Sequence, residues 1–554
     1  MNAILFGTSS AIALAALASA AVDLTPAALT WARRIGIGRF PDEAAWLDAA
    51  AERAMRWLIR TPTVRLTDQT RLLWLDMLRG EYRHAAIQHW QEAALVLGLA
   101  ELAGIGTSAP GGAPGSGGVP MSGGAAAFTA ASGGAAESGG WPAANGESGH
   151  AGGAAASASP APSAGTPQSG GAAQAGRGID AALFRSRLRA VLGRFLDRKF
   201  DADGGWRKKP EQVDAAMLAF AVMQSGMEPD RYRRAYDETA ELVLRHLGDD
   251  GLVRYRTGAV GGYRYVDTIG LVCPFLAAYG LAYGREDCVD LAVRQIEAYD
   301  RLGMHHGLDL PWHAYAAEDG RPLGLCGWGR GIAWYAIGLA EVWRLLPASD
   351  RRKAKLEERA ARLARAAARF QQPDGSWRWT VTRPETRADS SATAALAWFL
   401  LRSAAASGAP GDARDRALRA LRYLRGVTRQ DGAVDFAQGD TRDIGVYAQR
   451  FDALPFAQGF ALRAAAAAAA AVPGERTERA ERPAESAEST RRAESVEPAK
   501  RVNRAEPGDS TKRAESAEPA GRKKPAKSAE PAKRTESPVP SEPAEPAVPA
   551  GRDG

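Results

Sequence analysis

The chain has 554 residues, 45% of them apolar, and this length and composition allow at least one sizeable buried core. Its net charge is +7, and the 71 basic residues are interleaved with 64 acidic ones, so a nucleic-acid partner is not indicated. Three cysteines without any CxxC or Cys/His ligand spacing argue against a disulfide framework and a structural zinc site.

Residues 1–22 form an apolar N-terminal segment that contains Ala-Ser-Ala, a sequence typical of signal-peptide cleavage sites. No Lys or Arg precedes the apolar run, and the polar residues 7–10 weaken it as a membrane span. We therefore expect a cytoplasmic protein without stable membrane insertion. The alternative is a secreted protein, if residues 1–20 act as a signal peptide.

Two stretches contain too few apolar residues to offset the entropy lost on folding. Residues 103–178 are almost all Gly, Ala, Ser and Pro, and residues 473–554 repeat Lys or Arg with Glu, Pro and Ala. We expect a disordered insertion and a disordered C-terminal tail. The folded part then comprises residues 23–102 and 179–472, which is the size of an enzyme domain.

Apolar residues recur at helical spacing through most of the remaining chain, as Met217, Phe220 and Ala221 do in one segment. Alternating strand patterns are scarce, so the expected class is all-α. Helices are predicted over 24–36, 42–60, 67–79, 83–102, 214–226, 264–282, 286–303, 330–346, 351–371, 388–403, 412–427 and 452–472.

An Asp-Gly pair recurs five times along the chain, mostly just after a predicted helix. The pairs lie at 203–204, 250–251, 319–320, 374–375 and 431–432, with room for two helices between successive pairs. Asp-Gly supplies the positive φ of a tight turn. A helical hairpin cannot bury its own apolar face, so repeated hairpins stack or close into a ring. We therefore predict an (α/α)6 barrel, with 23–102 as its N-terminal helices and 179–472 as its main catalytic part.

Side chains that could take part in binding or catalysis lie close together in the sequence between residues 305 and 335. His305, His306 and His313 fall within nine residues, and Trp328 and an Arg330–Trp334 pair on one helix face follow. A guanidinium beside an indole suits a sugar acid, because it pairs with the carboxylate while the ring offers a flat surface. Two core tryptophans and an arginine in a helix-capping ion pair explain the same residues equally well.

Two acids, Asp214 and Asp267, stand in apolar helical surroundings. A carboxyl group among apolar residues has a raised pKa unless it is paired, and it can then exchange a proton near neutral pH. Each also lies near the start of a helix, where Asp commonly acts as the N-terminal cap. Capping and acid–base chemistry therefore both remain open for these two residues.

The segment 328–338, with Trp328-Gly329-Arg330-Gly331 followed by Trp334-Tyr335, resembles the tryptophan signature of glycoside hydrolase families 88 and 105. Five weaker motifs agree in order and approximate spacing. They are 212–214, 266–268, 305–309, 389–394 and 458–459. These families comprise the unsaturated glucuronyl and unsaturated rhamnogalacturonyl hydrolases, and their fold is an (α/α)6 barrel.

The resemblance implies a hydrolase that hydrates the C4=C5 bond of a 4,5-unsaturated uronic acid at the non-reducing end of a lyase product. It makes Asp267 the general acid and base, and Asp214 its partner. It places His306 and Arg330 on the sugar acid and Trp334 on the ring, with Trp328 beside them. Neither a cofactor nor a metal is implied. The expected partner is an oligosaccharide, most of all one from rhamnogalacturonan.

Two positions depart from the family pattern. Tyr265 stands where the family usually has Trp, and Ala333 where it usually has Gly. These differences leave the aglycone in doubt more than the reaction. The alternatives are another (α/α)6 sugar enzyme and a non-catalytic carbohydrate-binding protein.

Overall fold

The structure is a computed structural model that describes residues 2–65, 73–78, 84–105, 181–256, 261–441 and 443–470. The chain divides into two units, Met1–Glu481 and Arg482–Gly554, and all described residues belong to the first. The expected insertion, from residue 106 onward, and the expected tail lie outside the described residues.

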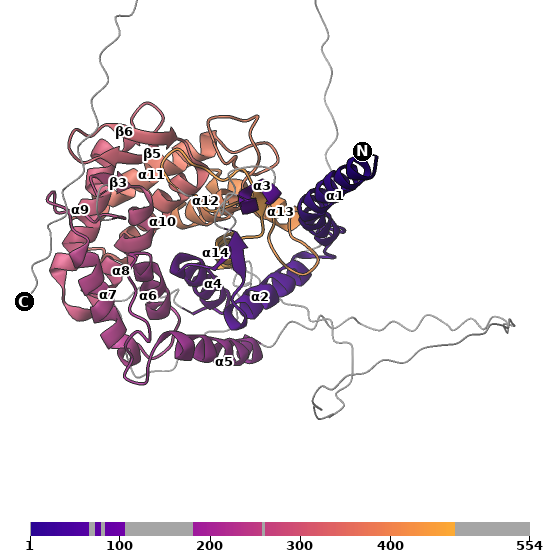
Figure 1. Ribbon diagram of the computed structural model, residues 1–554. Helices are drawn as coiled ribbons and strands as arrows, with labels where there is room; N and C mark the ends of the chain where they lie inside the picture. The colour runs from indigo at the N-terminus through magenta and orange to yellow at the C-terminus, as the bar shows by residue number, and fades with distance from the viewer. Residues whose placement is uncertain are drawn as a thin grey trace, which may run out of the picture. The chain divides into compact units, whose positions relative to one another are not determined.

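Six helices form the inner ring of a barrel (Figure 1), and each packs against the next until the last meets the first. In ring order they are α4 (His89–Leu102), α6 (Ala215–Met223), α8 (Asp267–Tyr283), α10 (Gly329–Leu345), α12 (Ser390–Ser403) and α14 (Pro455–Ala470). Almost every residue of α6 and α10 is buried. A helix that is apolar on all sides, such as AAMLAFAVM in α6, needs neighbours all around it, and the ring supplies them.

Six further helices pack outside this ring, each with one apolar face turned inward. They are α2 (Glu43–Ile59), α5 (Ala181–Lys199), α7 (Arg233–Arg245), α9 (Glu286–Leu302), α11 (Lys353–Arg369) and α13 (Ala413–Gly426). Each precedes one inner helix along the chain, which makes six hairpins. The predicted (α/α)6 barrel is confirmed.

Four of the five Asp-Gly pairs lie in the loops that follow outer helices α5, α7, α11 and α13. Their glycines, Gly204, Gly251, Gly375 and Gly432, have φ values between 70° and 87°, the left-handed region that glycine adopts without strain. The pair at 319–320 does not follow this pattern, because it joins two strands. After α9, the positive φ of 54° belongs to Asp309 instead.

Short strands cover the barrel mouth, where few were expected. β5 (Leu310–Ala316) pairs antiparallel with three others, β3 (Tyr263–Tyr265), β4 (Met304–His305) and β6 (Pro322–Cys326). Two smaller pairs are β1 (Thr63–Arg65) with β2 (His84–Ala86), and β7 (Ala437–Gln438) with β8 (Phe451–Asp452). In β3 and β5, Tyr265 pairs with Ala314, and this register brings the start of α8 beside β5.

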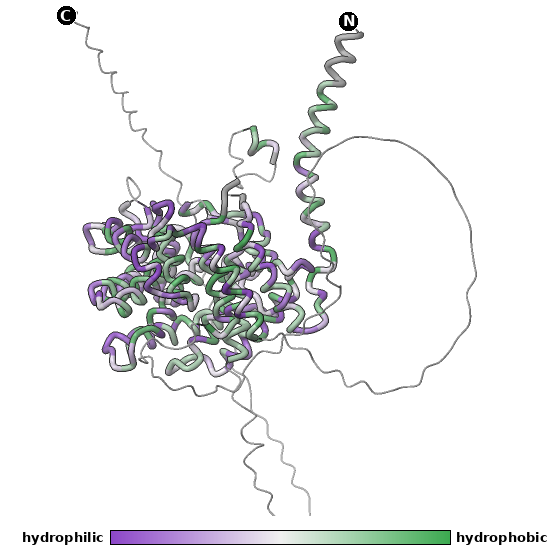
Figure 2. The backbone as a smooth tube through the Cα atoms, turned by 90° about the horizontal axis from the view of Figure 1, so that it is seen from below, coloured by the Kyte–Doolittle hydropathy of each residue, from purple (hydrophilic) through white to green (hydrophobic). Residues whose placement is uncertain are grey.

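Three helical segments lie outside the hairpins. They are α1 (Asn2–Arg33), α3 (Leu73–Leu78) and the 3-10 turn η1 (Asp230–Tyr232). Figure 2 shows α1 extending away from the barrel as a largely apolar helix. Among the described residues it alone is long and apolar enough to cross a membrane, and none of Ala11–Arg33 is buried. A signal sequence has the same properties, so the cellular location stays a prediction.

Candidate active site

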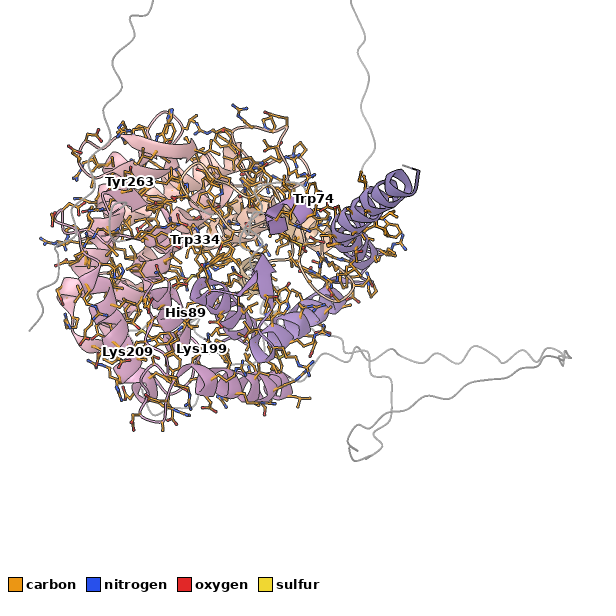
Figure 3. All side chains as sticks on the ribbon, in the orientation of Figure 1. Trp74, His89, Lys199, Lys209, Tyr263 and Trp334 are labelled. Carbon is orange, nitrogen blue, oxygen red and sulfur yellow. The ribbon has the colours of Figure 1, made fainter. Side chains whose placement is uncertain are left out.

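The inner helices bring their N-terminal ends together at the mouth of the barrel. Asp267 is the first residue of α8, and Trp328 and Asp389 directly precede α10 and α12. Helix N-termini carry a partial positive charge, so this end of the ring favours acidic groups and anions. Trp334 and His89, from α10 and α4, lie inside the ring in Figure 3.

A cavity of about 430 Å3 opens between these helix ends. It is lined by Trp90, Tyr255, Arg256, Tyr265, Asp267, Leu271, His313, Trp328, Arg330, Trp334, Asp440, Thr441 and Asp443. Aromatic walls around a few charged groups are typical of a small-molecule site, in which the rings supply contact area and the charges fix orientation.

Asp267 combines a raised pKa with an unpaired oxygen. Burial raises its pKa to about 7, and this effect outweighs the opposing charges of Arg330 and Arg256. Its Oδ2 atom accepts no hydrogen bond from the described residues. A carboxyl group that keeps its proton near neutral pH and has a free oxygen in a cavity is suited to general acid catalysis.

His313, on β5, lies next to this carboxyl group. Its Nε2 is 3.7 Å from Asp267 Oδ2, and its Nδ1 is 2.9 Å from the hydroxyl of Tyr447. That hydroxyl also accepts the backbone N–H of Leu325. Burial lowers the pKa of His313 to about 3, so the imidazole is neutral in the range where Asp267 titrates.

The guanidinium group of Arg330 forms hydrogen bonds within the protein, and these donors are not available to a ligand. Its Nη1 donates to the carbonyl of Gln438 and its Nη2 to the carbonyl of Gly439. Trp328 Nε1 donates to the side chain of Gln438, whose backbone N–H binds Asp389. The arginine, the tryptophan and Asp389 therefore hold the segment 438–441 against the cavity. Among the described residues, Arg330 does not form the capping ion pair considered for it.

The glycines of the tryptophan signature serve protein packing. A Cβ atom on Gly331 would lie 2.7 Å from the ring of Trp328, and one on Gly329 would lie 2.7 Å from the carbonyl of Arg378. These two glycines are therefore required by close contacts within the barrel.

The aromatic residues expected at the site do line the cavity. The Trp334 ring meets that of Trp90 edge to face, with 5.4 Å between their centroids. Tyr265 donates its hydroxyl to Asp443 Oδ1 at 3.2 Å. Trp334 and Trp328 are also each only 2% exposed, so both proposed roles, core residue and cavity wall, apply to them.

Asp214 lies deeper than Asp267 and does not line the cavity. Its Oδ2 accepts the backbone N–H of His89, the first residue of α4, at 3.0 Å, and it makes no capping bond to its own helix. Burial raises its pKa, although its bonds to the start of α4 act in the opposite direction. Burial, followed by the charges of Asp267 and Asp214, raises the pKa of Tyr255, so both carboxyl groups influence that phenol.

His306 is not part of this cavity. It lies in the turn between β4 and β5 and is exposed, and it lines a separate small pocket that includes Asp300 and Arg362. The strand β5 that follows carries the cavity histidine, His313. Of the two histidines, only His313 lines the cavity, and the expected contact of His306 with the sugar acid stays a prediction.

Sequence reasoning also missed Arg256, Asp440, Asp443 and Tyr447. They lie on loops whose course depends on tertiary packing, and helical periodicity says nothing about such loops. The available signal was the Tyr255-Arg256 pair in a loop shortly before Asp267. Among the described residues, no group of three or more His, Cys, Asp or Glu is arranged to hold a metal ion.

The ring of six helical hairpins and its cavity, with a protonatable carboxyl group among arginines and indoles, define an (α/α)6 enzyme suited to sugars. The family model of Glycosyl Hydrolase Family 88 matches residues 185–466, just over half of the chain. The chain belongs to this family, and it is a glycoside hydrolase.

Two solved structures with TM-scores above 0.5 agree with the fold. A possible member of family GH105 from Klebsiella pneumoniae is 15% identical, with a TM-score of 0.51, covering 78% of this chain and 94% of that one. A possible GH105 member from Salmonella enterica is 16% identical, with a TM-score of 0.52 and coverages of 78% and 96%. An unsaturated glucuronyl hydrolase from Bacillus sp. GL1 is 18% identical, with a TM-score of 0.45 and coverages of 78% and 95%. No curated protein matches the chain.

Proposed function

We propose that this enzyme hydrates the C4=C5 bond of a 4,5-unsaturated uronic acid at the non-reducing end of an oligosaccharide, and so releases the aglycone. The observation that carries the proposal is Asp267, a carboxyl group with a pKa raised to about 7 and an unpaired oxygen in the cavity. Family membership supports the same reaction.

In the proposed mechanism, Asp267 gives its proton to C4 and positive charge develops at C5 and the ring oxygen. The resulting carboxylate takes a proton from the water that adds to C5. The product is a hemiketal, which opens spontaneously and releases the aglycone. One carboxyl group acts first as acid and then as base, so no glycosyl-enzyme bond forms and the two-carboxylate distance rule of ordinary glycosidases does not apply.

The neighbours of Asp267 have distinct proposed roles. His313 is neutral and 3.7 Å away, so it can orient the carboxyl group or the water without adding a positive charge. Arg330 acts through its charge and through the segment that it holds. Arg256 lines the cavity with its Nη1 3.2 Å from Asp443, and its guanidinium is the better placed of the two to meet the substrate carboxylate.

The experiment measures turnover by the Asp267→Asn variant. Turnover is followed as the loss of the ultraviolet absorbance of the conjugated enoate in the substrate. The amide keeps the shape but cannot deliver the proton, so we expect a fall of at least about 100-fold. The control is Asp203→Asn, the same change at a side chain that is 83% exposed and outside the cavity, and it should retain activity.

The substrates should be lyase products with different aglycones. Unsaturated rhamnogalacturonan disaccharide is the first choice, with glycosaminoglycan disaccharides beside it. Near-normal turnover by Asp267→Asn would reject its role. A lack of enoate loss on every substrate would reject the proposed reaction.

A further inference from the structure

A second and larger cavity adjoins the catalytic one. The space between its walls, including the part open to solvent, is about 1750 Å3, against about 430 Å3 for the catalytic cavity. Its walls come from the end of α1, from α2, from the residues around β1 and from the segment 429–454. Asp440 lines both cavities, and its chain neighbours Gly439 and Thr441 line the larger and the catalytic cavity respectively, so the two adjoin at this segment. We call the larger cavity the outer groove.

Cations outnumber anions along the outer groove. Four arginines line it, Arg33, Arg53, Arg429 and Arg450, against three aspartates, Asp431, Asp440 and Asp452. Two of these aspartates form ion pairs with two of the arginines, since Arg53 contacts Asp431 and Arg429 Nη2 lies 2.5 Å from Asp452, which leaves Arg33 and Arg450 against Asp440. Burial raises the pKa of Asp440.

The arginines of the outer groove also repel one another. Burial lowers the pKa of Arg53 to about 10, and the charges of Arg56, Arg429 and Arg33 act in the same direction. An anion that entered among these groups would relieve the repulsion. Guanidinium groups bind carboxylate and sulfate oxygens through paired N–H donors, which makes such an anion a chemically suitable ligand.

Flat apolar surface lies beside these charges. Trp57 is partly exposed, with the Arg53 guanidinium 5.6 Å from its ring, and Pro26 and Leu29 of α1 stand on the same groove. In such a groove, the indole and the aliphatic side chains can contact the faces of sugar rings. The arginine guanidinium groups can form ion pairs with the acidic substituents of these sugars.

Resting on the proposed function, we propose that the outer groove binds the aglycone of the substrate, as the continuation of one oligosaccharide that carries carboxylate or sulfate groups. The shared position of Asp440 is the argument for this occupant, because a chain whose first sugar lies at Asp267 passes Asp440 as it leaves. The enzyme then favours longer anionic products of a lyase over disaccharides.

The experiment compares kcat/KM for an unsaturated disaccharide and an unsaturated tetrasaccharide of the same polymer. One pair of substrates carries carboxylates only, and the other carries sulfates. For the unchanged enzyme we expect a preference for the tetrasaccharide that declines as salt is added, since exposed charges are screened. In Arg33→Ala and Trp57→Ala the ratio of tetrasaccharide to disaccharide kcat/KM should fall about 5- to 10-fold, the size of one charged or aromatic contact.

Arg60→Ala is the matched control, since Arg60 is an exposed arginine that follows α2 and does not line the outer groove. It should leave the ratio unchanged. The two pairs of substrates show whether carboxylate or sulfate is preferred.

If the disaccharide is turned over as efficiently as the tetrasaccharide, and neither Arg33→Ala nor Trp57→Ala changes the ratio, the proposed role of the outer groove is wrong. The proposed reaction is not affected by that result. If no unsaturated substrate is turned over, the proposed function fails instead. Calorimetric titration with saturated anionic tetrasaccharides then tests binding in the outer groove independently of turnover. Loss of binding in Arg33→Ala supports it, and equal binding by both proteins rejects it.

Discussion

Asp267 keeps its proton at a cost to the stability of the folded protein. Its folded-state pKa of about 7 lies above the ordinary 3.8, because the charged form is poorly solvated in the cavity. Stability that is fully present below pH 3.8 is therefore lost as the pH rises, and the loss is complete above about pH 7. The ionised Asp267 side chain thus opposes folding above about pH 7.

This linkage predicts that Asp267→Asn stabilises the protein at high pH. The amide cannot ionise, so the variant should melt several degrees above the unchanged enzyme at pH 8 and at nearly the same temperature at pH 4. Thermal unfolding followed by circular dichroism over this pH range measures the difference. Equal melting temperatures at both pH values would show that Asp267 is not held protonated.

Site residues that stand at the start of a helix could be predicted from the sequence. Asp267, Trp328 and Arg330 stand at helix starts, which periodicity and motif spacing locate well, and the structure brings all three to one cavity. His313 could not be told from His306 in the same way. The two histidines are seven residues apart, and only the pairing of β5 with β3 and β4 decides which one faces Asp267.

At the scale of elements, the ring closes where α4 and α14 touch without side chains between them. A Cβ atom on Gly459 would lie 2.0 Å from the carbonyl of Ala94, and one on Gly98 would lie 2.3 Å from the carbonyl of Gly459. The contact joins the first and last helices of the ring across most of the chain. Glycine is required there because two backbones occupy the space that a methyl group would need.

We predict that Gly459→Ala destabilises the protein by about 1–3 kcal/mol, the usual cost of forcing atoms into a packed core. The matched control is Gly193→Ala on α5, where nothing lies within 4 Å of an added Cβ. There the better helix propensity of alanine should stabilise by about 0.5–1 kcal/mol. Urea unfolding of both variants measures the two effects, and similar values of one sign would contradict this account of ring closure.

The pairing of outer and inner helices was largely readable from the sequence, whereas the strands at the mouth were not. Outer helices such as α9 and α13 keep one apolar face, and inner helices such as α8 are apolar throughout, so their pattern marks them as helices. β5 was missed because its seven residues mix aromatic, polar and small side chains. Its pairing with β3 and β6 comes from the loops around it.

Across the whole molecule, the end of the barrel opposite the active site is closed by a buried ionic cluster. Arg463 of α14 donates to Glu101 of α4 and contacts Glu341 of α10, and Arg402 of α12 lies 2.9 Å from Glu101. Burial disfavours the charge of Glu101, but Arg463 and Arg402 outweigh it and hold the pKa of Glu101 below its usual value. Four of the six inner helices are therefore tied together through one arginine and its neighbours.

Arg463→Met leaves Glu101 and Glu341 buried near one another without their shared partner, and removing one side of a buried ion pair costs about 3–5 kcal/mol. The free energy of unfolding in urea should fall by that amount. Arg294→Met, an exposed arginine on α9, should stay within about 0.5 kcal/mol of the unchanged protein.

Arg463→Lys keeps a positive charge beside Glu101 and Glu341 while it changes the packing, so it should retain much of the stability that Arg463→Met loses. Because the cluster lies at the far ends of the inner helices, activity per folded molecule should survive in both variants. A small loss in Arg463→Met, or an equal loss in Arg463→Lys, would mean that packing around the arginine holds the helices together, and its charge does not.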